Sequence, residues 1–95
     1  MRAEYLSLLS EARILLSQYS VRSWPEVLAK WERKARFAPW MLLQHFAKVT
    51  KSKLGGMGSL GDVVIFRDGK SEEKANNRFL EIVGALYVVT TKIAG

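Results

Sequence analysis

The last quarter of the chain carries the pattern that most restricts its fold. From residue 75 to residue 93, apolar side chains recur at alternating intervals of four and three, which places them on one face of an α-helix: Ala75, Phe79, Ile82, Leu86, Val89 and Ile93. Between residues 82 and 89 the chain also has Val83, Ala85, Tyr87 and Val88, so apolar side chains surround the helix there. A helix that is apolar on all sides has to be covered on all sides. The fold must therefore place neighbours around most of this helix.

Three segments upstream show helical spacing as well. Residues 2–19 carry apolar side chains at intervals of three and four, residues 24–36 follow a capping box formed by Ser23 and Glu26, and a third helix is expected over residues 39–50. The apolar stripe of the first helix consists of Tyr5, Leu8, Ala12, Leu15 and Tyr19, widened by Leu6, Leu9 and Leu16. The stripe of the second helix is Trp24, Val27, Leu28, Trp31 and Ala35, and that of the third is Trp40, Leu43, Phe46 and Ala47, with Met41 and Leu42 adjoining.

A glycine-rich connection follows, with four glycines in the nine residues 54–62. The next segment, Val63–Phe66, is typical of a β-strand, and Asp68 with Gly69 predicts a turn. No second strand is evident in the chain, so this segment either pairs with its copy in another subunit or is extended and buried. Ser71 is expected to cap the last helix.

These patterns predict one all-α domain over residues 1–95, with four helices, a glycine-rich irregular connection and one short extended segment before the last helix. Three partner helices in so small a domain could hardly cover the last helix on every side. We therefore expect a second copy of the chain to cover it, which predicts a homo-oligomer, a dimer or higher. The residues expected to contact that copy are Ile82, Leu86, Tyr87 and Val89.

The composition restricts the chemistry and the compartment. The chain has no cysteine, which excludes disulfides, thiolate catalysis and sulfur-ligated metal sites. The N-terminus lacks the apolar run and the cleavage site of a signal peptide, and no stretch reaches the roughly 18 to 20 apolar residues that a membrane span requires. We therefore expect a cytoplasmic protein that does not insert into a membrane.

Positive charge is concentrated in the middle of the chain. The segment from Lys30 to Lys53 has seven basic residues and one acid, Glu32, and accounts for the whole net charge of +6. This asymmetry is typical either of contact with an anionic partner such as nucleic acid or of a solvated lysine-rich face. The residues that could contact an anion or nucleic acid are Lys30, Arg33, Lys34, Lys48, Lys51 and Lys53.

Candidate catalytic and metal-ligating residues are few. His45 is the single histidine and has no carboxylate at helical spacing, so a histidine making one hydrogen bond near a helix end is favoured over a general base. The adjacent acids Glu72 and Glu73 point apart on a helix, and Asp62 is interpreted as a cap of loop amides. We expect no metal, no cofactor and no enzymatic activity.

The glycine-rich connection has two interpretations. Successive glycines can form an anion cradle, and Gly55, Gly56, Gly58 and Ser59 could form a small-molecule site with Trp40 as one wall. However, the loop lacks the Gly-Lys-Ser/Thr ending and the following helix of a phosphate-binding loop. A structural junction, in which Gly55 and Gly56 end the third helix, is therefore the favoured interpretation.

Residues 55–65, Gly-Gly-Met-Gly-Ser-Leu-Gly-Asp-Val-Val-Ile, resemble a motif of a family of small uncharacterised bacterial proteins: Gly-Gly-Met-Gly-Ser-hydrophobic-Asn-Asp-Leu-Val. In that family a helix opening with Asn-Arg follows, similar to residues 76–79 here, and runs to a tyrosine that Tyr87 resembles. The similarity covers about residues 40–93, and Gly61 departs from the family's asparagine. The resemblance implies a helical fold and an accessory role, since some members are similar to cargo of mobile elements such as integron cassettes. It implies no catalytic residue.

The expected function is therefore an oligomeric accessory protein that acts through protein–protein interaction. Two alternatives stay open at this point. One is nucleic-acid binding through the basic residues of the second and third helices, and the other is small-molecule binding at the glycine-rich connection.

Overall fold

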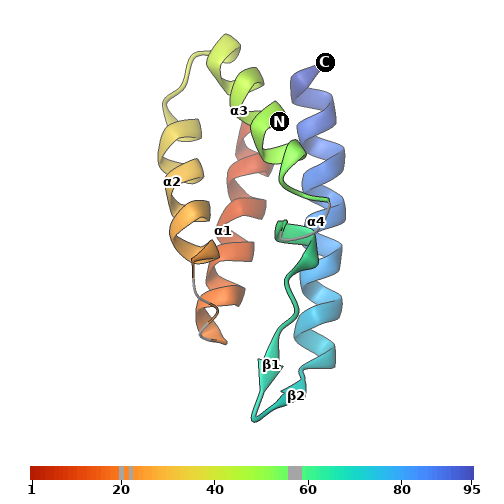
Figure 1. Cartoon of the computed structure of the whole chain (residues 1–95). Helices are drawn as coiled ribbons and strands as arrows, with labels where there is room; N and C mark the ends of the chain where they lie inside the picture. Colours follow the sequence, from red (N-terminus) through yellow and green to blue (C-terminus); the bar gives the residue numbers. More distant parts are fainter. Residues whose placement is uncertain (20, 22, 56–58) are drawn as a thin grey trace.

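Four α-helices form the described part of the chain in the computed structural model, which covers residues 1–19, 21, 23–55 and 59–95 (Figure 1). The helices are α1 (Arg2–Gln18), α2 (Trp24–Arg36), α3 (Trp40–Ser52) and α4 (Glu73–Ala94). Between α3 and α4 lie a 3₁₀ turn, η1 (Leu60–Asp62), and two short strands, β1 (Phe66–Arg67) and β2 (Lys70–Ser71). The all-α prediction is confirmed. None of the described helices is long and apolar enough to cross a bilayer.

The helices pack as two pairs, α1 with α2 and α3 with α4, and the two pairs meet where α1 packs against α4. Successive helices run in opposite directions, α1 packs against both α2 and α4, and α3 packs against α4 (Figure 1). The α4 helix has 22 residues and extends along most of the molecule, which measures 43 × 20 × 20 Å. The α3 helix has 13 residues and is about 20 Å long, too short to cover all of α4. The segment between α3 and β1 covers the rest, and its Leu60 and Ile65 are fully buried.

The buried face of α4 is the predicted one, whereas the buried face of α1 is centred on other residues than predicted. All of the predicted α4 residues are buried. On α1 the buried residues are Tyr5, Leu9, Ala12 and Leu16, all within the widened stripe, whereas Leu8, Leu15 and Tyr19 from its predicted centre are only partly buried. The cause is that α1 carries leucine on several sides, so the positions of α2 and α4 decide which side is innermost.

The predicted buried face of α2 is partly wrong. Leu28 and Ala35 are buried as predicted, but Trp24 and Trp31 are only partly buried, and the charged Glu32 takes a core-facing position. Burial of an unpaired carboxylate would be costly, and Arg13 of α1 offsets part of this cost because its Nε lies 2.5 Å from a Glu32 oxygen.

Both predicted serine caps are also wrong. Ser23 precedes α2 but makes no side-chain cap bond, since its φ of 75° is outside the extended region that N-cap residues usually adopt. Ser71 belongs to β2, and Glu72 is the residue before α4.

The extended segment finds its strand partner within the same chain. Phe66 pairs with Ser71 and Arg67 pairs with Lys70, antiparallel, and the predicted Asp68–Gly69 turn joins them. Both turn residues have positive φ, 52° for Asp68 and 78° for Gly69. A two-residue hairpin turn whose twist matches that of its flanking strands requires positive φ at both positions. Of the expected Val63–Phe66 strand, only Phe66 pairs.

The side chain of Asn76 on α4 forms hydrogen bonds with the backbone of this connection. The amide nitrogen of Ile65 donates to Asn76 Oδ1 at 2.7 Å, and Asn76 Nδ2 donates to the Ile65 carbonyl oxygen at 2.9 Å. The same Nδ2 lies 2.9 Å from the Glu72 carbonyl oxygen and 3.1 Å from Ser71 Oγ. One side chain therefore satisfies both backbone groups of the buried Ile65, as a neighbouring strand would.

We predict that Asn76→Ala destabilises the fold by about 1–3 kcal/mol, because it leaves the amide of the buried Ile65 without its partner, whereas the Ile65 carbonyl keeps the bond from the Glu72 amide. The measurement is the free energy of unfolding in urea. The matched control is Asn77→Ala at the next, exposed position, which should change stability by less than about 0.5 kcal/mol. Equal effects of the two substitutions would contradict the role of Asn76.

Tyr5 links α1 to α3 inside the core. Its hydroxyl lies 2.5 Å from Thr50 Oγ1, and both side chains are almost completely buried. Burial raises the pKa of Tyr5 above its ordinary value of 10.0, and the hydrogen bond to Thr50 opposes part of that rise. The folded state therefore holds the phenolic proton more tightly than the unfolded state does.

The raised pKa predicts a loss of stability at alkaline pH. The contribution of Tyr5 is fully present below pH 10, the ordinary tyrosine value, and decreases as the pH rises toward the pKa of the folded state. Tyr5→Phe removes this pH dependence, so the unfolding free energy of the variant should fall less above pH 10 than that of the wild type. Thr50→Val keeps the buried phenol and serves as the control, which should retain the alkaline loss.

Candidate functional site

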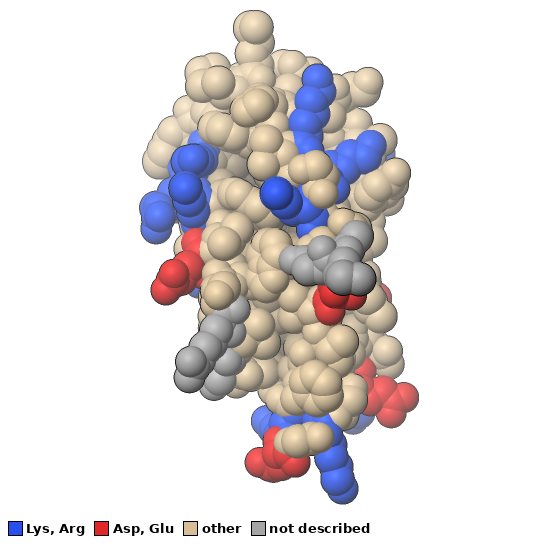
Figure 2. Space-filling view, viewed as in Figure 1, with Lys and Arg blue, Asp and Glu red and all other residues tan. Residues whose placement is uncertain are grey.

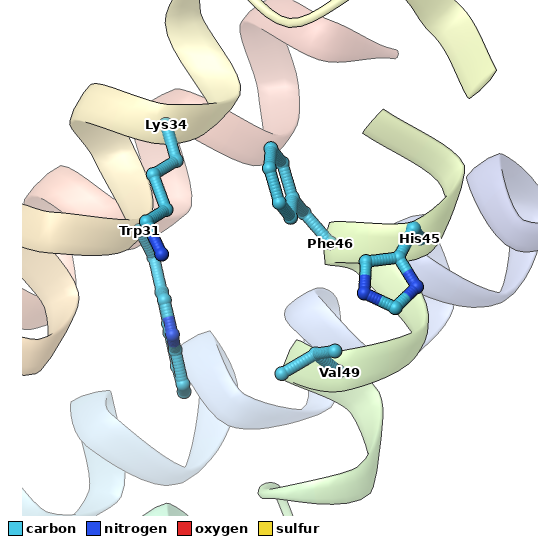
Figure 3. A pocket seen from close by; sticks show the side chains of 5 residues that line it. All are labelled: Trp31, Lys34, His45, Phe46 and Val49. Carbon is cyan, nitrogen blue, oxygen red and sulfur yellow. The ribbon is translucent and has the colours of Figure 1, made fainter. Parts of the chain in front are cut away.

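An apolar groove separates α2 from α3. Trp31 and Lys34 of α2 lie across from His45, Phe46 and Val49 of α3, and together they line a pocket of about 140 Å³ (Figure 3). The groove exists because α2 packs mainly on α1 and α3 packs mainly on α4, with little direct contact between α2 and α3. Trp31 and Phe46 are only partly buried, so their rings form its walls.

The groove continues along α2 into a second pocket. This pocket is lined by Ser23, Trp24, Val27, Trp31 and Lys53, so Trp31 is common to both. The rings of Trp24 and Trp31 meet edge to face, with centroids 6.2 Å apart and planes at 62°. The sequence reasoning missed this groove because it assigned Trp24, Trp31 and Phe46 to the core. The sequence signal for the groove was the seven-residue spacing of Trp24 and Trp31, which places both rings on the same side of α2, two helical turns apart.

The predicted anion-contact residues divide between two surfaces. Figure 2 shows Lys and Arg side chains over α2 and over α3, on either side of a largely uncharged strip. Lys34 and Lys53 line the groove, and Lys30 and Arg33 are exposed on α2. Lys48 and Lys51 instead line a hollow against the C-terminal end of α4, where Lys51 Nζ lies 5.0 Å from the centre of the Tyr87 ring.

The predicted self-association residues separate as well. Ile82, Leu86 and Val89 are at most 1% exposed inside a single chain, so they belong to its core and are not accessible to a second copy. The prediction that these three residues contact a second copy is therefore wrong, because the apolar face of α4 to which they belong forms the core of the single chain. Tyr87, in contrast, is 54% exposed.

The exposed side of α4 carries other apolar residues. Leu80 and Val88 are 57% and 51% exposed, and a Cβ placed on Gly84 would meet nothing within 4 Å. With Tyr87 these residues form the outer face of α4, defined here as Leu80, Gly84, Tyr87 and Val88. No charged residue occurs between Glu81 and Lys92, so Gly84, Tyr87 and Val88 lie in an uncharged stretch of about three turns, and Leu80 lies at its edge, before Glu81.

A second exposed apolar cluster lies where α2 meets α3. Phe37 is 86% exposed and Met41 is 81% exposed, and Trp40 and Leu42 beside them are about half exposed. Sequence reasoning missed this cluster because it treated the break before Pro39 only as a helix boundary. Large exposed apolar clusters of this kind are typical of interaction surfaces.

The described part of the glycine-rich connection does not form one site with Trp40. Trp40 begins α3, while Gly55 and Ser59 follow its other end, and a 13-residue helix separates them by about 20 Å. The predicted pocket wall is therefore wrong. Gly56 and Gly58 lie outside the described residues. Ser59 is buried, and the amide of Leu60 donates to the Lys53 carbonyl oxygen at 2.8 Å.

The polar candidates do not converge. His45 is exposed on the groove rim, with its ring centre 6.0 Å from that of Phe46. Within the described ranges, no three His, Asp or Glu side chains lie close enough together to hold a metal ion.

Comparison with known proteins returns no protein-family model, no curated protein and no solved structure that matches this chain. The resemblance of residues 55–65 to a bacterial family rests in part on Gly56, Met57 and Gly58, which lie outside the described residues. Gly61, where that family has asparagine, is described. A Cβ at Gly61 would lie 2.1 Å from the Leu54 carbonyl oxygen, so the backbone here leaves no room for a side chain.

We predict that Gly61→Ala destabilises the chain by about 1–3 kcal/mol, because the new methyl group has to displace a backbone carbonyl. Thermal unfolding measures the change. Gly55→Ala is the matched control in the same connection, since a Cβ there meets nothing within 4 Å. If Gly61→Ala were as stable as Gly55→Ala, the close packing of the connection against Leu54 would be wrong.

Proposed function

We propose that the protein is a non-catalytic interaction module that acts as a homodimer formed through the outer face of α4. The observation that carries this proposal is the exposure of Tyr87 and Val88 on a stretch of helix without any charged residue, with the exposed Leu80 at its edge just before Glu81. A soluble chain gains from covering such a face, at roughly 25 cal/mol for each Å² of apolar surface removed from water.

Gly84 supports the same conclusion. Glycine in a helix interior costs about 1 kcal/mol relative to alanine. Within the described residues nothing approaches the Gly84 position closely enough to require this, since a Cβ there would lie in open space. A second helix that packs closely against the backbone at this point gives the glycine a physical reason.

The residue pattern favours an antiparallel pair with twofold symmetry. If the axis passes near position 86, Val88 of each copy lies opposite Gly84 of the other, so that a large side chain meets a small one. The same register brings Glu81 of one copy close to Lys92 of the other, twice, as an isologous interface requires. Both charged residues are exposed on the same flank of α4.

The wider role in this proposal is that of an accessory protein. Its support is the resemblance of residues 55–65 and 76–79 to small bacterial proteins, some of them similar to cargo of mobile elements. A cytoplasmic location belongs to the same proposal, and the absence of cysteine is compatible with a reducing compartment.

We predict that wild-type protein sediments as a dimer and that Val88→Glu sediments as a monomer with unchanged helical content by circular dichroism. The substitution places a charge in the apolar contact but touches no core residue. Ser7→Glu, at an exposed position of α1, is the control and should remain dimeric. Wild-type protein that stays monomeric up to about 1 mM would contradict the proposal.

Charge reversal tests the orientation of the pair. Glu81→Lys should weaken the dimer, and the double variant Glu81→Lys with Lys92→Glu should restore it. Gly84→Ala should stabilise the monomer and weaken the dimer, because the methyl group favours the helix and fills the space that Val88 of the other copy occupies. A dimer that Glu81→Lys leaves unchanged would exclude the antiparallel register.

A further inference from the structure

We infer that the groove between α2 and α3 binds an acidic amphipathic helix of another protein. This inference concerns a different surface from the dimer contact and does not depend on it. The groove consists of the two pockets that share Trp31, and its rim carries Lys34 and Lys53. Helices that bind in apolar grooves are recognised through a few anchor side chains at helical spacing.

The size of the groove fits such anchors. The pocket between Trp31 and Phe46 has a volume of about 140 Å³, close to the roughly 150 Å³ of a cavity that holds one benzene ring. It therefore accommodates one aromatic or branched side chain. Trp24 and Trp31, which mark the two pockets, lie seven residues apart on α2, a rise of about 10 Å. Anchors at positions i and i+7 of a bound helix have the same separation.

The charge of the rim selects an acidic ligand. Lys34 and Lys53 line the pockets, and Lys30 and Arg33 are exposed on the same helix as Lys34. Among the described residues, the ion pairs between side chains involve Arg13 and Arg78 rather than these four. Glu32, the acid of α2 nearest to them in sequence, faces α1 and is paired with Arg13. Within the described residues no ion pair neutralises Lys34 or Lys53, and these cations favour carboxylates beside the apolar anchors.

The same geometry disfavours a nucleic acid strand. Bases need exposed ring faces for stacking and a continuous track of cations for the phosphates. Trp24 and Trp31 are partly buried and meet edge to face with planes at 62°, so they do not offer parallel ring faces on which successive bases could stack. Lys48 and Lys51 lie on the α4 side of α3 and do not extend the cationic rim.

A phage-displayed library of helical peptides, selected against the full chain, tests this inference. We expect selected peptides to carry two apolar residues seven positions apart and acidic residues beside them. The best peptide is then synthesised and titrated into labelled protein, and the three tryptophan indole resonances are followed by NMR. The resonances of Trp24 and Trp31 should shift, while Trp40, which lies outside both pockets, should not.

Charge variants locate the peptide on the rim. Lys34→Glu and Lys53→Glu should each weaken binding by about tenfold, and binding should weaken as salt is raised. Lys74→Glu, at an exposed position of α4 outside both pockets, is the matched control and should bind the peptide as the wild type does. Lysine in place of the acidic residues of the peptide should abolish binding.

Several results would overturn the inference. They are a selection that enriches no peptide or enriches basic ones, binding that Lys34→Glu and Lys53→Glu leave unchanged, and shifts confined to Trp40. A single-stranded oligo-dT that shifts Trp24 and Trp31 more strongly than the peptide would make the groove a nucleic-acid site instead. Shifts of Trp31 that depend on protein concentration and vanish in Val88→Glu would make it part of the dimer contact.

Discussion

Burial of one face of α4 is the constraint on which the rest of the structure depends. This helix presents a continuous row of apolar side chains from Ala75 to Ile93, all of them buried. No single neighbour is long enough to cover the row. The chain covers it with α1 and α3 over one part and with Leu60 and Ile65 of the connection over another. The irregular connection is thus a core element, and the amide of Asn76 supplies the hydrogen bonds that a regular neighbour would have provided.

Because α1 and α3 are both engaged by α4, α2 is held mainly by α1. Two polar contacts secure it there: Arg13 pairs with Glu32, and the guanidinium of Arg2 donates to the carbonyl oxygens of Ala35 and Arg36 at the C-terminal end of α2, at 2.9 and 3.2 Å. A cation at this end of a helix is favoured by the helix dipole. The outward side of α2 is left with two tryptophans that α3 only partly covers. The groove is therefore a consequence of how the four helices divide their contacts.

The two proposed interaction surfaces have different chemistry, which separates their functions. The outer face of α4 is uncharged and includes a glycine, features suited to close packing of two like helices. The groove combines aromatic walls with a basic rim and suits a ligand of opposite charge. A dimer formed through α4 would carry two grooves, so a partner with two acidic helices could bind both and gain from effective concentration.

The sequence by itself determined the helices, the Asp68–Gly69 turn and the core face of α4, because these depend on spacing and on local backbone preference. It could not decide which side of α1 faces inward, since leucines occupy several sides, nor that Glu32 rather than Trp31 takes the inner position on α2, since this depends on Arg13 from another helix. The two surfaces also required tertiary structure. Periodicity shows that a residue such as Leu86 or Trp31 is apolar, but only the arrangement of neighbouring helices decides whether it is covered within the chain or left for a partner.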